Sequence, residues 1–308
     1  MDDEAIIKRT PTERYSGHES FVCRYGWLPK LYAAISDNQF LLKEDDQATT
    51  QLGIGRNMVR SIQFWGEAAG VIESATGGGH QVGQVGRPLF GEDGWDTYLE
   101  DLESLWLLHW TISTKANLAA WNCVFGSSAI TRFTRKQLQE AVRTRAGNLA
   151  KNLAASTIEQ HVSVFCSTYR QTNSSSAGSD DTLWSPFQDL GLLRQSVTSD
   201  GSVFIAETSP PIGLSMRVFA EVLRDYWQCR HFNNKAIRLN EIVLGDFSPG
   251  VVLRLDESEV RKQLMAIEDW TKGLMRLVDT ADTQQVVVDS PMAFYKLSAD
   301  ILKGEEYV

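Results

Sequence analysis

The stretch QLGIGRNMVRSIQFWGEAAGVIES, residues 51–74, determines how the N-terminal part of the chain folds. Within it, apolar side chains recur every three or four residues, the spacing of one helix face: Met58, Val59, Ile62, Trp65 and Ala69. The sequence Leu52-Gly53-Ile54-Gly55 predicts a tight turn before this helix, and Gly70 marks its end. A strand at residues 71–72 and the Gly-rich segment TGGGHQVGQVGRP (76–88) follow. This order predicts a winged helix-turn-helix.

Segments further along the chain extend the same theme. DTYLEDLESLWLLHWTIS (96–113) is too continuously apolar for a surface helix, so we expect it in the centre of the molecule. Thr134 is a natural N-cap for a basic amphipathic helix in TRFTRKQLQEAV (131–142), and Ser156 with Glu159 predicts a capping box in the next helix. These two helices resemble a second helix-turn-helix.

The last third repeats the pattern. Helices are predicted in SPPIGLSMRVFAEVLRDYWQ (209–228) and DESEVRKQL (256–264), and QQVVVDS (284–290) with MAFYKLS (292–298) predicts two wing strands that turn at Ser290-Pro291. Two breaks, 76–88 and the Ser-rich QTNSSSAGSDD (171–181), divide the chain into modules at 1–90, 91–175 and 176–308. The predicted fold class is mainly α with small β wings (α+β), built as tandem winged-helix modules around a helical core.

Composition excludes several protein classes. The chain has 308 residues, and no stretch approaches the ~20 apolar residues that cross a bilayer. The N-terminus lacks the apolar segment of a secretory signal, and the four cysteines form no CxxC pair, so we expect a cytoplasmic protein. A net charge of −9 argues against a protein that coats nucleic acid through bulk charge.

Charge is nevertheless segregated along the chain. Residues 131–151 carry six bases and one acid, whereas residues 92–103 carry six acids and no base. Both runs are also compatible with solvated helix faces. For DNA contact we select Arg56, Asn57, Arg60 and Gln63 on the first predicted recognition helix, and these bases on the second basic segment: Arg132, Arg135, Lys136, Arg143 and Arg145. The alternative for Arg56 and Arg60 is pairing with acids elsewhere.

Several long motifs resemble a bacterial family described as a domain of unknown function, which includes DNA nickases of single-strand phosphorothioation (Ssp) systems. The matching stretches are SGHESFVCRYGWLPK (16–30), LGIGRNMVRSIQFWGEAAGVI (52–72), YLEDLESLWLLHW (98–110), FTRKQLQEAV (133–142), STIEQHVSVFCSTY (156–169) and DLGLL (189–193). The resemblance implies double-stranded DNA as substrate, Mg²⁺ or another divalent cation, and a role in anti-phage defence. It also implies three partners: a cysteine desulfurase, an ATPase and an ATP pyrophosphatase-like sulfur-transfer protein.

Phosphodiester hydrolysis needs a hard cation with oxygen ligands and a base that deprotonates water. His18 and Glu19, followed by Arg24 and Lys30, form one candidate catalytic cluster. Glu19 would hold the metal, His18 would act as base or orient the phosphate, and Arg24 and Lys30 would bind phosphate oxygens. The alternative is a Glu19 that pairs with Arg24 at a helix N-terminus. Glu100 and Asp101, with His109, form a second candidate metal site, for which helix capping is the alternative.

No PD-(D/E)xK, HNH or GIY-YIG nuclease pattern can be placed in the sequence. Zinc-ligand spacing and a phosphate-binding GxxxxGK[ST] loop are also absent, so ATP use would belong to a partner. Two hypotheses remain: a Mg²⁺-dependent nicking endonuclease that opens one strand for sulfur incorporation, and a non-catalytic winged-helix adaptor or regulator that recruits the sulfur-transfer machinery. An interaction protein that binds no nucleic acid is a third possibility.

Overall fold

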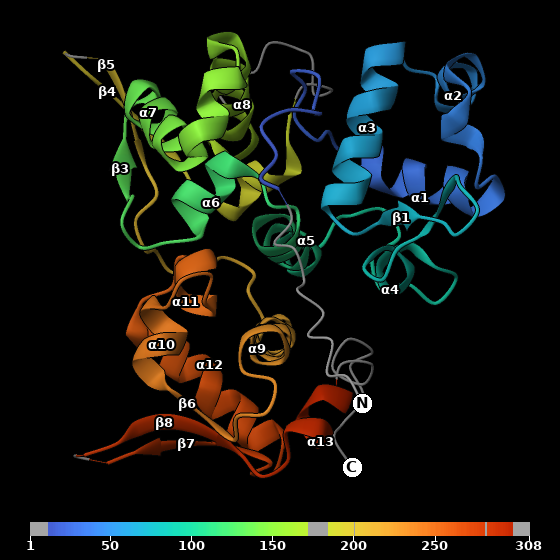
Figure 1. Ribbon diagram of the computed structural model, residues 1–308. Helices are drawn as coiled ribbons and strands as arrows, with labels where there is room; N and C mark the ends of the chain where they lie inside the picture. The colour runs from blue at the N-terminus through green and yellow to red at the C-terminus, as the bar shows by residue number, and fades with distance from the viewer. Residues whose placement is uncertain (1–11, 172–183, 200, 281, 298–308) are drawn as a thin grey trace, which may run out of the picture.

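The computed structural model describes residues 12–171, 184–199, 201–280 and 282–297. Helices dominate, and the strands form small antiparallel sheets, as predicted. Figure 1 shows one helix, α5, near the centre, with the N-terminal, middle and C-terminal parts of the chain arranged around it. No helix in these ranges is both long and apolar enough to span a bilayer.

The N-terminal part has the predicted winged helix-turn-helix order. Its elements are α1 (Trp27–Asp37), the 3-10 helix η1 (Leu41–Lys43), α2 (Asp45–Leu52), α3 (Arg56–Ala68), β1 (Ile72–Ser74), β2 (His80–Val82) and α4 (Gly86–Phe90). The α2–α3 turn contains Gly53 in the left-handed region, at φ 64°, which costs glycine nothing sterically. The wing β1–β2 is an antiparallel hairpin, and the His80 N–H donates to the carbonyl of Gln39 at 2.8 Å.

The middle part begins with the central helix. Its elements are α5 (Leu102–Lys115), α6 (Ala119–Phe125), β3 (Arg132–Phe133), α7 (Arg135–Ala146), the 3-10 helix η2 (Gly147–Asn152), α8 (Ala155–Tyr169), the 3-10 helix η5 (Pro186–Leu190), β4 (Arg194–Thr198) and β5 (Gly201–Ile205). Helix α5 is buried continuously from Ser104 to Ser113, which confirms its predicted central position. It contacts α3, α6, α9 and η5.

Local capping predictions in this part have different outcomes. Thr134 caps α7 and forms a capping box with Gln137, so the predicted N-cap is confirmed. The predicted Ser156 capping box is wrong, because α8 already begins at Ala155 and its N-cap, Ala154, has no side-chain hydrogen bond. Strand β5 pairs with both β3 and β4, so this sheet crosses the boundary predicted at residue 175. Residues 172–181 of the predicted Ser-rich linker lie outside the described residues.

The C-terminal part is a further winged helix. Its elements are α9 (Met216–Arg230), β6 (Ala236–Arg238), α10 (Leu239–Leu244), α11 (Pro249–Val252), α12 (Glu257–Trp270), β7 (Met275–Asp279), β8 (Gln284–Val288) and α13 (Pro291–Lys296). The wing is β7–β8, so the prediction of a strand at 292–298 is wrong for its described residues. Ser290 caps α13 and Pro291 occupies its first turn, where a missing N–H costs nothing.

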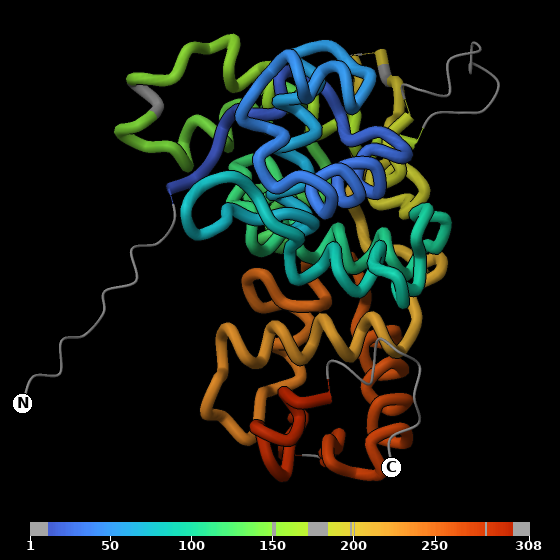
Figure 2. The backbone as a smooth tube through the Cα atoms, turned by 90° about the vertical axis from the view of Figure 1, so that its right-hand side faces the viewer, coloured from blue at the N-terminus to red at the C-terminus, as the bar shows by residue number. Residues whose placement is uncertain are grey.

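The middle and C-terminal sheets share one topology. Their strand orders, β3-β5-β4 and β6-β8-β7, place the last strand between the other two. By position before the wing hairpin, α3, α8 and α12 correspond to one another, each being the second helix of a helix-turn-helix. Figure 2 shows the C-terminal part as a separate layer beneath the other two, and one continuous apolar cluster nevertheless includes buried residues from all parts.

A buried chain of hydrogen bonds joins the middle and C-terminal parts. The Trp121 indole N–H donates to the Tyr169 hydroxyl at 3.0 Å. His109 Nε2 lies 2.9 Å from the Val252 carbonyl, which can only accept, so the His109 proton is on Nε2. The unprotonated Nδ1 of His109 therefore accepts from the Tyr169 hydroxyl at 2.9 Å. The chain links α6, α8, α5 and α11, and every group in it has its partner.

Replacing Tyr169 with phenylalanine tests this chain. The Tyr169→Phe variant keeps the ring but leaves the Trp121 N–H and His109 Nδ1 without the hydroxyl. We expect the free energy of unfolding to fall by about 1–3 kcal/mol, the cost of leaving buried polar groups unpaired. Denaturant unfolding measures this decrease, and Tyr98→Phe on the exposed loop is the matched control. Equal stability of the two variants would show that this chain of hydrogen bonds does not stabilise the fold.

Candidate nucleic-acid interface

Helix α3 presents one polar face to solvent. Val59, Ile62 and Trp65 point into the core, whereas Arg56, Asn57 and Arg60 are exposed. The first turn of α3 contains no acidic residue, so the positive end of the helix dipole is not neutralised within the helix. This is the arrangement expected of a helix that approaches phosphate groups or base edges.

Acids of the preceding helix hold the two arginines of this face. Arg56 Nε lies 3.2 Å from Asp45 Oδ2, and Arg56 Nη2 donates to Asp46 Oδ1 at 3.2 Å. Arg60 Nη2 lies 3.6 Å from the same Asp45 oxygen. The alternative of pairing with acids is therefore confirmed. The arginine side chains still keep more than half of their surface exposed, at 58% and 54%, so the pairing leaves them accessible.

Gln63 connects α3 to the wing. Its amide donates to Glu67 Oε1 at 2.9 Å, and the same oxygen lies 3.1 Å from His80 Nε2 on β2. Gln63 is only partly exposed. This contact joins α3 to β2, and Gln63 is less accessible than Arg56, Asn57 and Arg60.

His18 lies in the core, whereas a general base is expected to be exposed to its substrate. It is 1% exposed, and its Nε2 lies 3.2 Å from Nδ1 of His161 on α8. The Ala120 N–H donates to His161 Nε2 at 3.1 Å, so the His161 proton is on Nδ1 and points at His18. His18 then carries its proton on Nδ1, which has no hydrogen-bond partner among the described residues.

Burial keeps this histidine pair neutral. Desolvation, with a smaller contribution from the charge of Arg14, lowers the pKa of His18 to about 4. Desolvation and repulsion from His18 lower the pKa of His161 to about 3. The neutral pair lies where the N-terminal loop contacts α8.

The structure does not bring the four residues of the first predicted cluster together. Arg24 lies over the rings of Phe21 and Trp27. Lys30 donates to the carbonyl of Leu52 at 3.2 Å, at the end of α2. Glu19 is partly exposed, and its backbone is left-handed at φ 48°. Within the described ranges, no hydrogen bond or ion pair joins any two of these four side chains.

Glu100 and Asp101 lie in an acidic pocket at the start of α5. The buried carboxylate of Asp96 accepts from their backbone N–H groups at 2.8 and 3.1 Å. Asp101 also accepts from the Glu103 N–H, so the capping alternative is confirmed for Asp101. The remaining lining is Leu102, Glu103 and Gly213. His109 is not part of this site, because it is enclosed in the core with Tyr169.

The basic side chains of the middle part are distributed around α7. Arg132 lies 3.3 Å and Arg194 3.9 Å from the two carboxylate oxygens of Glu207. Arg135 lies over the Phe204 ring, and Arg145 pairs with Glu13. Lys136 is exposed and Arg143 partly so. The run of bases is therefore a mixed surface, partly neutralised by acids from other elements.

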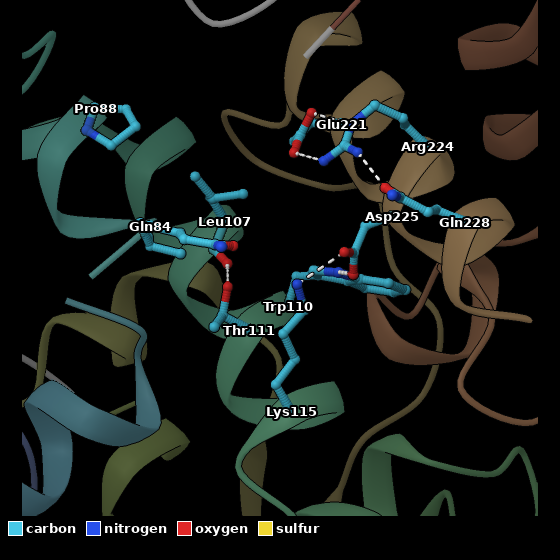
Figure 3. A pocket seen from close by; sticks show the side chains of 11 residues that line it. Gln84, Pro88, Leu107, Trp110, Thr111, Lys115, Glu221, Arg224, Asp225 and Gln228 are labelled. Carbon is cyan, nitrogen blue, oxygen red and sulfur yellow. Dashed lines mark hydrogen bonds and ion pairs between the residues drawn. The ribbon is translucent and has the colours of Figure 1, made fainter. Parts of the chain in front are cut away.

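A second pocket, of about 230 Å³, lies between α5 and α9 (Figure 3). Its charges are paired, between α5 and α9 in one case and within α9 in the other. Asp225 accepts from the Trp110 indole N–H at 2.8 Å and from Lys115 Nζ at 2.7 Å, while Arg224 pairs with Glu221. The contacts of Asp225 with Trp110 and Lys115 join α9 of the C-terminal part to the central helix α5.

The sequence did not predict the contacts that three groups of residues make with the candidate site residues: Asp45 and Asp46 with the α3 arginines, His161 with His18, and Asp96 with Glu100 and Asp101. For Asp45 and Asp46 a signal exists, since two acids open the first helix of a helix-turn-helix just before a recognition helix with two arginines. His161 has none, because it lies 143 residues from His18.

The chain is similar to known proteins over nearly its whole length. A family model described as "Protein of unknown function (DUF4007)" matches residues 15–305. Two crystal structures of SspB, one of them magnesium ion-bound, each match with a TM-score of 0.80 and 26% identity. The magnesium-bound match covers 95% of this chain and 90% of the other, and the second covers 94% and 86%. No curated protein matches.

Proposed function

The chain belongs to the DUF4007 family, and from this premise we propose that it acts on DNA in an SspB-type phosphorothioation system. One observation carries the proposal: the exposed face of α3 has two arginines and an asparagine at the N-terminal end of a winged-helix recognition helix. In helix-turn-helix proteins this end of the second helix enters the major groove. Arg60 and Arg56 would then contact phosphates or base edges, and Asn57 a base edge.

The corresponding helices of the other two parts support this choice. The exposed positions in the first turns of α8 are Ala155, Ser156, Glu159 and Gln160, which carry no positive charge. On α12, Lys262 pairs with Glu259, and Arg261 pairs with Glu257 and with Asp279 of β7. The Arg261 side chain keeps only 22% of its surface exposed, whereas both paired arginines of α3 keep more than half. Helix α3 is thus best suited to DNA. Bases of α7, the first helix of its helix-turn-helix, would add phosphate contacts.

Nicking is the activity we propose. SspB has been crystallised with a magnesium ion, and Mg²⁺ is commonly bound by one or two carboxylates and several waters. The exposed carboxylates of Glu100 and Asp101 fit this donor set, although no group of three or more His, Cys, Asp or Glu side chains in the described ranges could hold a metal. A bound cation would stabilise the negative charge that develops on phosphate during hydrolysis.

A second candidate function is an adaptor that brings the desulfurase and sulfur-transfer partners to DNA. The observation that favours it is the enclosed, neutral state of His18, which removes the predicted general base from solvent. Both candidates use the same α3 face, and only the first requires a metal ion.

Conversion of supercoiled plasmid to open circle distinguishes the two candidates. With Mg²⁺ we expect open circle, and none with EDTA. Glu100→Gln combined with Asp101→Asn, which preserves the cap of α5, should slow nicking by about a hundredfold if these groups hold the ion. Glu92→Gln with Asp93→Asn is the matched control. Intact DNA binding without nicking by the wild-type chain would favour the adaptor.

A further inference from the structure

Arg56 is held at one edge of its guanidinium by two carboxylates. Asp45 lies at its Nε and Asp46 at its Nη2, both at 3.2 Å. A guanidinium has five N–H groups in a rigid planar fork. In the described ranges no hydrogen bond or ion pair involves Nη1. The end of the fork, formed by Nη1 and Nη2, is therefore available while the side edge is fixed.

This arrangement differs from that of an arginine that only neutralises phosphate. Such an arginine gains affinity from its net charge, and two neighbouring carboxylates reduce that gain. Asp45 also lies 3.6 Å from Arg60, so one carboxylate orients both side chains. The two acids weaken nonspecific attraction but restrict the direction in which Arg56 points.

We propose that Arg56 recognises a guanine in the major groove through N7 and O6, with Asp45 and Asp46 as positioning residues. The inference rests on the proposed function, because it requires α3 to enter the groove. Arg56 is the first residue of α3, where recognition helices contact base edges. Guanine presents two acceptors there, N7 and O6, which match the two donors at the end of an arginine fork.

Selection of duplexes from a random pool by the purified full chain tests the proposal. We expect an enriched site with a fixed guanine. Replacing that guanine with 7-deazaguanine, which lacks the N7 acceptor, should weaken binding by about fivefold or more, since a bidentate arginine contact contributes about 1–3 kcal/mol of discrimination.

Two variants assign the effect to these side chains. Arg56→Lys keeps the charge but lacks the fork, and Asp45→Asn keeps the shape but lacks the charge. Both should lose most of the discrimination between guanine and 7-deazaguanine, and Arg261→Lys on α12 should retain it. Circular dichroism checks that each variant is folded.

Three outcomes would overturn the proposal. If Asp45→Asn binds all duplexes more tightly and keeps the guanine preference, Asp45 only weakens phosphate attraction. If the wild-type chain binds DNA through α3 with no fixed guanine, base recognition fails while the proposed function stands. If the wild-type chain binds no duplex, both fail.

Discussion

Replacing Arg56 and Arg60 together with alanine is expected to weaken binding to duplex DNA by about a hundredfold, since each arginine that contacts DNA contributes about 1–3 kcal/mol. The logarithmic dependence of affinity on salt should also become shallower, by about one unit for each phosphate that the variant no longer neutralises. Fluorescence anisotropy across a salt series measures both quantities. The expectation follows from the exposed position of both side chains at the N-terminal end of α3.

A variant of equal charge change provides the control. Arg261→Ala with Lys262→Ala removes two bases from α12, the corresponding helix of the C-terminal winged helix, where both are paired with acids. We expect its affinity for DNA to stay within about threefold of the wild type, because only general charge attraction changes. An equal decrease in affinity for the two double variants would show that α3 has no special role.

The second large effect concerns acid stability. His18, His109 and His161 are buried, and desolvation lowers their pKa values to about 4, 4 and 3. The unfolded chain binds protons near pH 6.5, and the folded chain does so only near pH 4 or below. Folding stability is therefore fully present above pH 6.5 and falls as the pH decreases through this window.

The magnitude is comparable with the whole stability of a protein. Between pH 7 and pH 5 each histidine should remove roughly 2 kcal/mol from the free energy of unfolding, against about 5–15 kcal/mol in total. Urea unfolding at a series of pH values measures the decrease. His109→Gln should make the decrease less steep by roughly one proton. A free energy that is constant from pH 7 to pH 5 would be inconsistent with three neutral, enclosed imidazoles.

The sequence by itself determined the features that depend on neighbours within one or two helical turns. The apolar spacing from Met58 to Trp65 is sufficient to predict α3, because side chains three and four residues apart share a face. Thr134 indicates the start of α7, since an N-cap hydrogen bond joins residues three apart. The continuous apolar run of α5 likewise indicated a buried helix.

Local patterns were insufficient where the same residues are compatible with two different local structures or roles. The segment after Ser290 alternates like a strand, yet it forms α13, because Pro291 suits the first turn of a helix and β8 already has partners on both sides. Similarly, the carboxylate of Asp101 suits both a metal ligand and a helix N-cap, so the sequence did not distinguish the two roles. The structure shows it as the N-cap of α5.

Only the tertiary structure decided which distant groups meet. It brought His161 to His18 across 143 residues and paired β5 with β3 across a segment predicted to divide two modules. Such contacts depend on the packing of whole helices and sheets, which leaves no periodic signal near either residue. The sequence therefore predicted that α3 is a helix and which of its faces is exposed. The fold decided that His18 is buried and neutral, and that the arginines of α3 are held in ion pairs.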